Sequence, residues 1–229
     1  MWSGPRNLST AMMYAFGNRG DMTAVDEPFY GAYLAQTGIN HPLAQETMAA
    51  LDCDPESVAQ NLALYPTPHQ YEKHMVHHMR PGFPLDWMDE VQNVFLLRHP
   101  ARVLASYLQK REAPTAEDLG FTQMRRLFDR ASRGAIPAVI DSEDVLRNPR
   151  TALSALCSAL CLPFDDAMLS WPTGPKHFDG PWAPHWYGAV HRSTGFASAP
   201  GDVPGVPPGY TDMIDVAMAD YTWMRQHRV

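Results

Sequence analysis

The clearest hydrophobic run in the chain is Val94-Phe95-Leu96-Leu97, four consecutive apolar residues that end at Arg98. A continuous apolar run of this length is typical of a parallel strand that is covered on both faces. We therefore predict a strand over 93–98. Weaker runs predict further strands at 23–26, 71–79 and 138–142. At the start of the chain there is room for only a short stub of strand.

Helical patterns lie between these runs, and several carry start signals. Asp54-Pro55 opens a predicted helix to Leu64, and Asn148-Pro149 opens another to Leu160. Further helices are predicted at 11–16, from 101 to about 111, within 115–133 and at 211–228. Strands that alternate with helices predict an α/β fold, a parallel sheet with helices on both faces. No boundary demands a second domain, so we expect one domain over 1–229.

Composition narrows the class of protein. The net charge of −7 over 229 residues argues against a general nucleic-acid binder. No apolar run approaches the ~20 residues of a membrane helix, so we expect no membrane partner. The three cysteines Cys53, Cys157 and Cys161 form neither a zinc pattern nor a disulfide framework, which favours a cytoplasmic location. The sequence carries no signal for an oligomeric state.

The N-terminal turn is the first candidate binding site. A Gly/Pro turn runs through Arg6 to Ser9 and Thr10 and leads directly into the helical run predicted at 11–16. Free N–H groups and the positive end of the helix dipole make such a terminus suitable for a phosphate or sulfate. The plainer alternative is an ordinary capped helix with Ser3 or Asn7 near its cap.

The spacing of this turn disfavours an ATP or GTP site. A nucleotide triphosphate loop has a second glycine five residues after the first, followed by lysine. Counted from Gly4, these positions hold Ser9 and Thr10.

A second turn follows the strand at 93–98. Arg98 ends the strand and Ser106 lies in the next helix, an arrangement that can hold another phosphate. The alternative is a surface arginine and an unremarkable helical serine.

Candidate bases follow two other strands. Asp26 and Glu27 lie at the carboxyl end of the strand at 23–26, where open α/β sheets place ligands. Asp26 could cap the next helix, with Pro28 in its first turn. In the strand at 71–79, alternation would put His74 and His78 on one face and His77 on the other. No spacing completes a metal site, so a base or a core histidine are the two interpretations.

The segment 171–209 is rich in Pro, Gly and aromatic residues and has no period. Loops of this length are usually functional, so we predict a lid over an acceptor pocket. The alternative is a structural cover. The candidate pocket walls are Trp182, His185, Trp186 and Tyr187.

Two motifs together resemble the P-loop sulfotransferase family. Pro5-Arg6-Asn7-Leu8-Ser9-Thr10 is similar to the family's 5′-phosphosulfate loop, except that Leu8 replaces the usual glycine. Phe95 to Tyr107 is similar to its 3′-phosphate motif, with Arg98 and Ser106 at the two phosphate-binding positions. The resemblance runs in order over residues 3–164. Beyond it, Arg192 and Ser193 lie where the family has a basic loop over the 3′-phosphate.

The resemblance implies transfer of a sulfuryl group from 3′-phosphoadenylyl sulfate to a hydroxyl or amine of a small-molecule acceptor, without a metal. It implies that Arg6, with the loop residues Asn7, Leu8, Ser9 and Thr10, grips the 5′-phosphosulfate. Glu27 is the first choice of base, and His78 or His74 is the second. The alternatives are a non-catalytic nucleotide- or anion-binding module on the same fold, and an atypical phosphotransferase.

Overall fold

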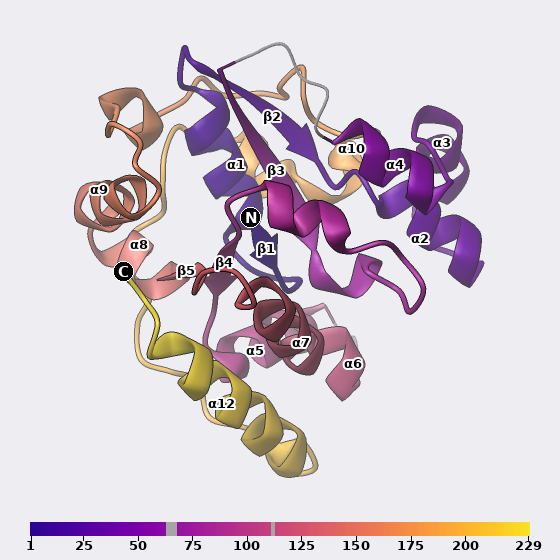
Figure 1. Ribbon diagram of the computed structural model, residues 1–229. Coiled ribbons are helices and arrows are strands. Elements are labelled where there is room, and N and C mark those ends of the chain that lie inside the picture. Colours follow the sequence, from indigo (N-terminus) through magenta and orange to yellow (C-terminus); the bar gives the residue numbers. More distant parts are fainter. Residues whose placement is uncertain (63–67, 111–112) are drawn as a thin grey trace. The chain divides into compact units, whose positions relative to one another are not determined.

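The computed structural model describes residues 1–62, 68–110 and 113–229 (Figure 1). These residues group into two compact units. Unit 1 comprises Met1, Ser9–Val91 and Asp165–Phe196, and unit 2 comprises Trp2–Leu8, Gln92–Phe164 and Ala197–Val229. The N-terminal turn therefore belongs to unit 2, and the helix that follows it belongs to unit 1.

Unit 1 is built on two parallel strands. β2 (Met22–Asp26) pairs with β3 (His69–Met75), and the register places Asp26 opposite Lys73. α1 (Ser9–Gly17) packs against both strands. The other helical elements of unit 1 are α2 (Tyr30–Thr37), α3 (Ala44–Ala50), α4 (Pro55–Asn61), η1 (Val76–His78), η2 (Asp86–Glu90), η3 (Asp166–Leu169), α10 (Ala183–Trp186) and α11 (Gly188–His191).

Unit 2 holds three parallel strands. β4 (Val94–Leu97) pairs with β1 (Trp2–Ser3) on one side and with β5 (Ala138–Asp141) on the other. All four residues of β4 are buried, which explains why its sequence is uninterrupted by polar residues. The helices of unit 2 are α5 (Pro100–Gln109), α6 (Ala116–Leu119), α7 (Phe121–Ala131), α8 (Ser142–Arg147), α9 (Pro149–Ala159) and α12 (Thr211–Arg225).

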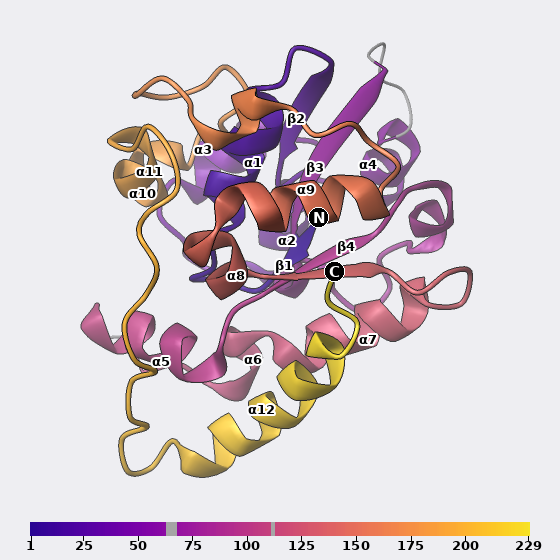
Figure 2. The ribbon, with the colours of Figure 1, turned by 90° about the vertical axis from the view of Figure 1, so that its left-hand side faces the viewer.

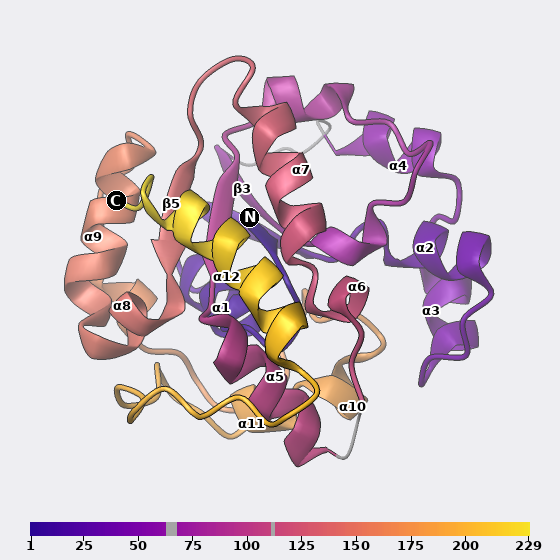
Figure 3. The same cartoon turned by 90° about the horizontal axis from the view of Figure 1, so that it is seen from below.

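Helices cover both faces of the strands of unit 2. Both α9 and α12 contact β5, and α12 also packs on α7. Figure 2 shows α9 on one side of β4 and β5, with α7 and α12 on the other, and Figure 3 shows the same separation from below. Every strand pair described above is parallel, so the predicted parallel α/β fold is confirmed. A single domain over 1–229 stays a prediction.

Two local predictions were wrong. The strand predicted to reach residue 79 ends at Met75, because Val76–His78 forms a 3₁₀ turn closed by a hydrogen bond from Met79 N to Val76 O. Asp26 does not cap α2, whose N-cap is Phe29, because a buried lysine takes up its carboxylate. The predicted continuation of α4 to Leu64 and of α5 to about residue 111 lies outside the described residues.

Candidate active site

The N-terminal loop of unit 2 is held in a strained shape. Arg6 has a φ of 54°, in the left-handed region that side chains other than glycine rarely occupy. Asn7 fixes the loop to β4 by donating from Nδ2 to the carbonyl of Leu96 (2.9 Å), while its Oδ1 accepts from the amide of Leu8 (2.7 Å). Non-glycine residues in this region tend to cluster at functional sites, where the surrounding structure compensates for their strain.

Arg98 ties this loop to the second predicted phosphate turn. Its Nη1 donates to the main-chain oxygen of Arg6, and the Arg6 guanidinium lies 5.0 Å from the centre of the Tyr107 ring. Ser106, half-buried, precedes Tyr107 in α5. Burial, and then the charge of Arg102, lower the pKa of Arg98. Unit 2 thus brings Arg6 and Asn7, predicted for the 5′-phosphosulfate, next to the predicted 3′-phosphate segment.

The same turn is shaped by local capping. His99 Nδ1 accepts from the amide of Ala101 (3.2 Å), and Pro100 occupies the first helical position. These two residues start α5 directly after Arg98. Ser9 and Thr10, predicted to lie in the turn before a helix at 11–16, are instead the first two residues of α1 in unit 1, and Ser9 is buried.

Unit 1 holds a buried cluster of charged groups at the carboxyl end of β2. The ammonium of Lys73 donates to Asp26 Oδ1 (2.9 Å), to Glu27 Oε1 and to the hydroxyl of Tyr187 (2.6 Å). Tyr187 in turn donates to Asp26 Oδ2 (2.8 Å) and accepts from the indole of Trp182 (3.0 Å). Two carboxylates share one ammonium, so the three charges sum to −1 when all are ionised.

Glu27 is the member of this cluster best placed to accept a proton. It has a φ of 45°, also left-handed. Lys73 holds Oε1, while Oε2 lies 3.7 Å from Nδ1 of His78. Burial raises the pKa of Glu27, and the charge of Lys73 opposes that rise. One oxygen is therefore anchored, and the other faces a neutral ring.

The two candidate histidines are not equivalent. His78 stacks on Tyr30 and Tyr33, with ring centres 4.5 and 4.8 Å away, and its buried Nδ1 has no hydrogen-bond partner within the described part of the chain. Burial holds the pKa of His78 well below its ordinary value, so the ring is neutral. His74 instead pairs through Nε2 with Glu72 Oε2 (2.9 Å). His78 is thus the histidine whose ring lies at ion-pair distance from Glu27.

The predicted separation of the histidines onto two faces was wrong. Because Val76–His78 is a 3₁₀ turn and not strand, the rings of His77 and His78 lie 4.5 Å apart. A period of two applies only while the backbone stays extended.

The predicted loop residues 192 and 193 lie in unit 1. Ser193 Oγ donates to Val190 O (2.7 Å) and accepts from the indole of Trp171 (3.1 Å), while Arg192 is exposed. Of the predicted pocket walls, Trp182 and Tyr187 are buried, and His185 is exposed. The role of these residues toward a nucleotide or an acceptor stays a prediction.

Sequence reasoning missed Lys73, and it misjudged Asp26. One signal was present, since Lys73 stands in a strand between Tyr71 and Met75, where a charged residue requires a partner once buried. Its partners come from residue 26–27 and residue 187, and no local pattern could have identified them.

Two further properties bear on the chemistry. Across residues 1–62, 68–110 and 113–229, no three or more His, Cys, Asp or Glu side chains are grouped so as to hold a metal ion. No helix in these ranges is long and apolar enough to cross a membrane. That the reaction needs no metal stays a prediction.

Comparison with known proteins identifies the family of this chain. The sequence profile described as Sulfotransferase domain matches residues 1–228. Two Arabidopsis thaliana proteins, branched-chain-amino-acid aminotransferase-like proteins 2 and 1, are 34% and 35% identical over 229 and 230 residues. These matches cover 99% of this chain but 41% of each relative, so the chain spans less than half of their length.

Solved structures show the same fold. A sulfotransferase from Alicyclobacillus acidocaldarius matches with a TM-score of 0.58 and 10% identity, over 100% of this chain and 96% of its own. The sulfotransferase domain from the curacin biosynthetic pathway matches with a TM-score of 0.56 and 14% identity, over 95% of both chains. At such identities the likeness establishes the fold alone.

Proposed function

The chain belongs to the sulfotransferase domain family, and from that premise we propose that it transfers a sulfuryl group from 3′-phosphoadenylyl sulfate to a hydroxyl or amine of a small-molecule acceptor. The observation that carries the choice of donor is the hydrogen bond from Arg98 to the carbonyl of Arg6. It joins, within unit 2, the loop assigned to the 5′-phosphosulfate and the turn assigned to the 3′-phosphate. A nucleotide donor with phosphate groups at its 3′ and 5′ positions could contact this turn and this loop at the same time.

The phosphate groups of the donor are assigned to residues that offer a positive charge or a hydrogen-bond donor. The proposal assigns the 3′-phosphate to Arg98 and Ser106, because a half-buried guanidinium bonded to a carbonyl still carries a full positive charge that an anion can neutralise. Arg6, Asn7, Leu8, Ser9 and Thr10 take the 5′-phosphosulfate. Arg6 also steadies the bridging oxygen on which negative charge develops as the bisphosphate leaves.

The reaction is an in-line displacement at sulfur. The acceptor oxygen or nitrogen forms a bond to sulfur while the bond from sulfur to the 5′-phosphate oxygen breaks, and adenosine 3′,5′-bisphosphate departs with that electron pair. The acceptor proton passes to Glu27 Oε2. Lys73 keeps the other oxygen of this carboxylate fixed, so the base is held in one orientation.

His78 is the second choice of base. Its unpaired Nδ1 is neutral and able to accept a proton, and it lies 3.7 Å from Glu27 Oε2. His74 is less suited, since Glu72 already occupies its Nε2.

The donor is tested by calorimetry on the full chain. Adenosine 3′,5′-bisphosphate should bind without magnesium and more tightly than AMP or ATP. Preference for ATP with magnesium would instead identify a phosphotransferase. A transfer assay with labelled 3′-phosphoadenylyl sulfate then tests turnover over a panel of hydroxyls and amines. Tight bisphosphate binding with no acceptor ever sulfated would favour the binding module.

The names of the two plant relatives add candidates to this panel. Both are described as branched-chain-amino-acid aminotransferase-like. We therefore include branched-chain amino acids and their 2-hydroxy analogues among the acceptors. A cytoplasmic location, and the absence of nucleic-acid and membrane partners, remain part of the proposal.

A further inference from the structure

A strap of irregular chain is hydrogen-bonded to the first turn of α5 in unit 2. We define the strap as residues 197–210, which connect Phe196 to α12 and contain Gly201, Gly205 and Gly209. Residues 201–203 are exposed, so the strap contributes little to the core. Its position on α5 therefore depends on specific polar contacts rather than on burial.

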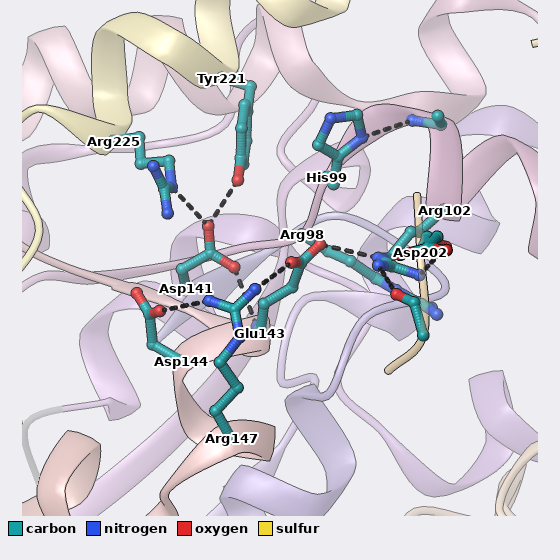
Figure 4. Close-up of polar contacts among 12 residues, drawn as sticks. Arg98, His99, Arg102, Asp141, Glu143, Asp144, Arg147, Asp202, Tyr221 and Arg225 are labelled. Carbon is teal, nitrogen blue, oxygen red and sulfur yellow. Dashed lines mark hydrogen bonds and ion pairs between the residues drawn. The ribbon is translucent and has the colours of Figure 1, made fainter. Parts of the chain in front are cut away.

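Arg102 supplies these contacts. Its Nη2 donates to the carbonyl of Gly201 (2.5 Å), and its Nη1 donates to the carbonyl of Asp202 (3.2 Å). Both bonds go to main-chain oxygens, so they fix the path of the strap and not a particular side chain. Figure 4 shows the guanidinium of Arg102 between Glu143 and Asp202.

Glu143 holds Arg102 in place. Its Oε1 accepts from Arg102 Nε at 2.7 Å, and the two side chains are only 12% and 11% exposed. Glu143 is itself fixed, because its amide donates to Asp141 Oδ1 (2.9 Å) at the start of α8. The carboxyl group of Asp141 is anchored in turn by Tyr221 (2.6 Å) and Arg225 (3.0 Å) of α12 (Figure 4). The contact therefore stands on a rigid support.

The contact lies at the proposed 3′-phosphate site. Arg102 falls midway between Arg98 and Ser106 in the sequence, four residues from each. Its charge contributes to the lowered pKa of Arg98, while Glu143 opposes that effect. Arg98 and Arg102 are therefore close enough for their charges to interact, and the Arg102–Glu143 pair stands beside the proposed phosphate ligand.

We propose that Arg102 and Glu143 are positioning residues that hold the strap as the rim of the nucleotide site at its 3′-phosphate end. This inference rests on the proposed function. Arg102 acts through the strap backbone, and Glu143 acts through Arg102. We call the Arg102–Glu143 pair the clamp. When the nucleotide binds, the clamp retains the strap over it. The clamp therefore stabilises ligands that carry a 3′-phosphate more than ligands that lack one.

The chain offers a matched control. Arg147 also contacts Glu143, through Oε2 at 3.5 Å, but it is 60% exposed and lies on the far side of the carboxylate from Arg102. Replacing Arg147 removes a positive partner of Glu143 and leaves the Arg102 contacts to the strap intact. Glu143→Gln keeps the shape of the side chain and removes its charge, while Arg102→Met keeps an unbranched stem and removes both donors to the strap.

The test combines two measurements on the full-length variants. Calorimetry compares adenosine 3′,5′-bisphosphate with AMP, and hydrogen exchange follows peptides that cover residues 197–210. We expect Glu143→Gln and Arg102→Met to weaken bisphosphate binding by about tenfold, as for one charge-assisted contact, with AMP binding unchanged. Bisphosphate should slow exchange in the strap of the wild-type protein and of Arg147→Met, but not in the other two variants.

The outcomes separate the inference from the function. The clamp inference is contradicted if both clamp variants bind the bisphosphate with wild-type affinity. It is also contradicted if the bisphosphate does not change hydrogen exchange in the strap of the wild-type protein. In either case the proposed function still stands. If the two clamp variants melt at lower temperatures but keep the wild-type ratio of bisphosphate to AMP affinity, Arg102 and Glu143 have a purely structural role. That result also contradicts the clamp inference. A wild-type protein that binds AMP as tightly as the bisphosphate contradicts the proposed function, and the clamp fails with it.

Discussion

The guanidinium of Arg98 donates a hydrogen bond to the main-chain carbonyl of Arg6, a residue 92 positions earlier in the sequence. The bond uses one nitrogen of a five-donor group and leaves its charge uncompensated by the carbonyl. Arg98 therefore has two roles in the proposed site. It fixes the loop that contains Arg6, and it offers a cation to the 3′-phosphate.

Arg98→Ala should weaken binding of adenosine 3′,5′-bisphosphate by roughly 1.5–3 kcal/mol, the magnitude of a lost charge-assisted contact. AMP lacks the 3′-phosphate, so its affinity should fall far less. Isothermal titration of both ligands measures the difference. Equal losses for the two would mean that Arg98 only shapes the loop.

Arg6 allows strain to be separated from charge. Its left-handed backbone costs a side-chain residue about 1–2 kcal/mol, and glycine does not pay this cost. Arg6→Gly should therefore be more stable than Arg6→Ala by about 1 kcal/mol in urea unfolding, after allowance for the greater freedom of unfolded glycine. Both variants should lose turnover alike, since both lack the cation.

Identical stabilities of the two Arg6 variants would show that the loop relaxes out of the left-handed region once the arginine is gone. In that case the strain at residue 6 is imposed by the side chain itself, through its contact with Tyr107, and not by the surrounding loop.

The elements that the sequence predicted well are those whose signals are local. Four apolar residues defined β4, and Asn148 followed by Pro149 defined the start of α9, where Asn148 Oδ1 accepts from the amide of Thr151 (3.1 Å). Such patterns depend on burial and capping within a few residues. The resemblance between residues 3–10 and 95–107 and known phosphate motifs was likewise a matter of local spacing.

The features that the sequence did not predict depend on contacts between distant segments. Asp26 looked like a helix cap, but it binds Lys73, which is 47 positions away, and Tyr187, which is 161 positions away. A local pattern holds no information about which strand will lie opposite. The clamp of Arg102 on the strap has the same character, because its two ends are about a hundred residues apart.

His78 should make the folded protein sensitive to acid. Burial depresses its pKa below the ordinary 6.5, so below that pH the unfolded chain takes up a proton that the folded chain does not. Stability is therefore fully present above pH 6.5 and falls as the pH decreases, by about 1.4 kcal/mol per pH unit for one such group. His78→Asn should make this slope shallower by that amount, as measured by urea unfolding between about pH 7 and pH 5.

A slope that His78→Asn does not alter would show that His78 gains a proton in the folded state, through a shift toward the carboxylate of Glu27. The residual slope in the His78 variant would then come from His74, whose pKa burial also lowers.

Glu27 carries the last and most direct prediction about the chemistry. An acceptor hydroxyl ionises far above neutral pH, so a base must take its proton as the sulfuryl group arrives. Glu27→Gln removes the base and keeps the shape, and turnover should fall by about 10²–10⁴-fold while bisphosphate affinity barely changes. Because burial raises the pKa of Glu27, the acid limb of kcat/KM should lie above the ordinary carboxyl range and disappear in the variant.

The competing assignment makes the opposite prediction for His78. If Glu27→Gln keeps near-full turnover while His78→Asn abolishes it, the base is the histidine, and Glu27 only orients it from 3.7 Å. His74→Asn distinguishes a base from general damage to β3, because His74 also lies in β3 and its Nε2 is taken up by Glu72. If turnover falls in both the Glu27 and the His78 variants but not in His74→Asn, the two residues act together, with Glu27 as the base and His78 holding its Oε2 in place from 3.7 Å.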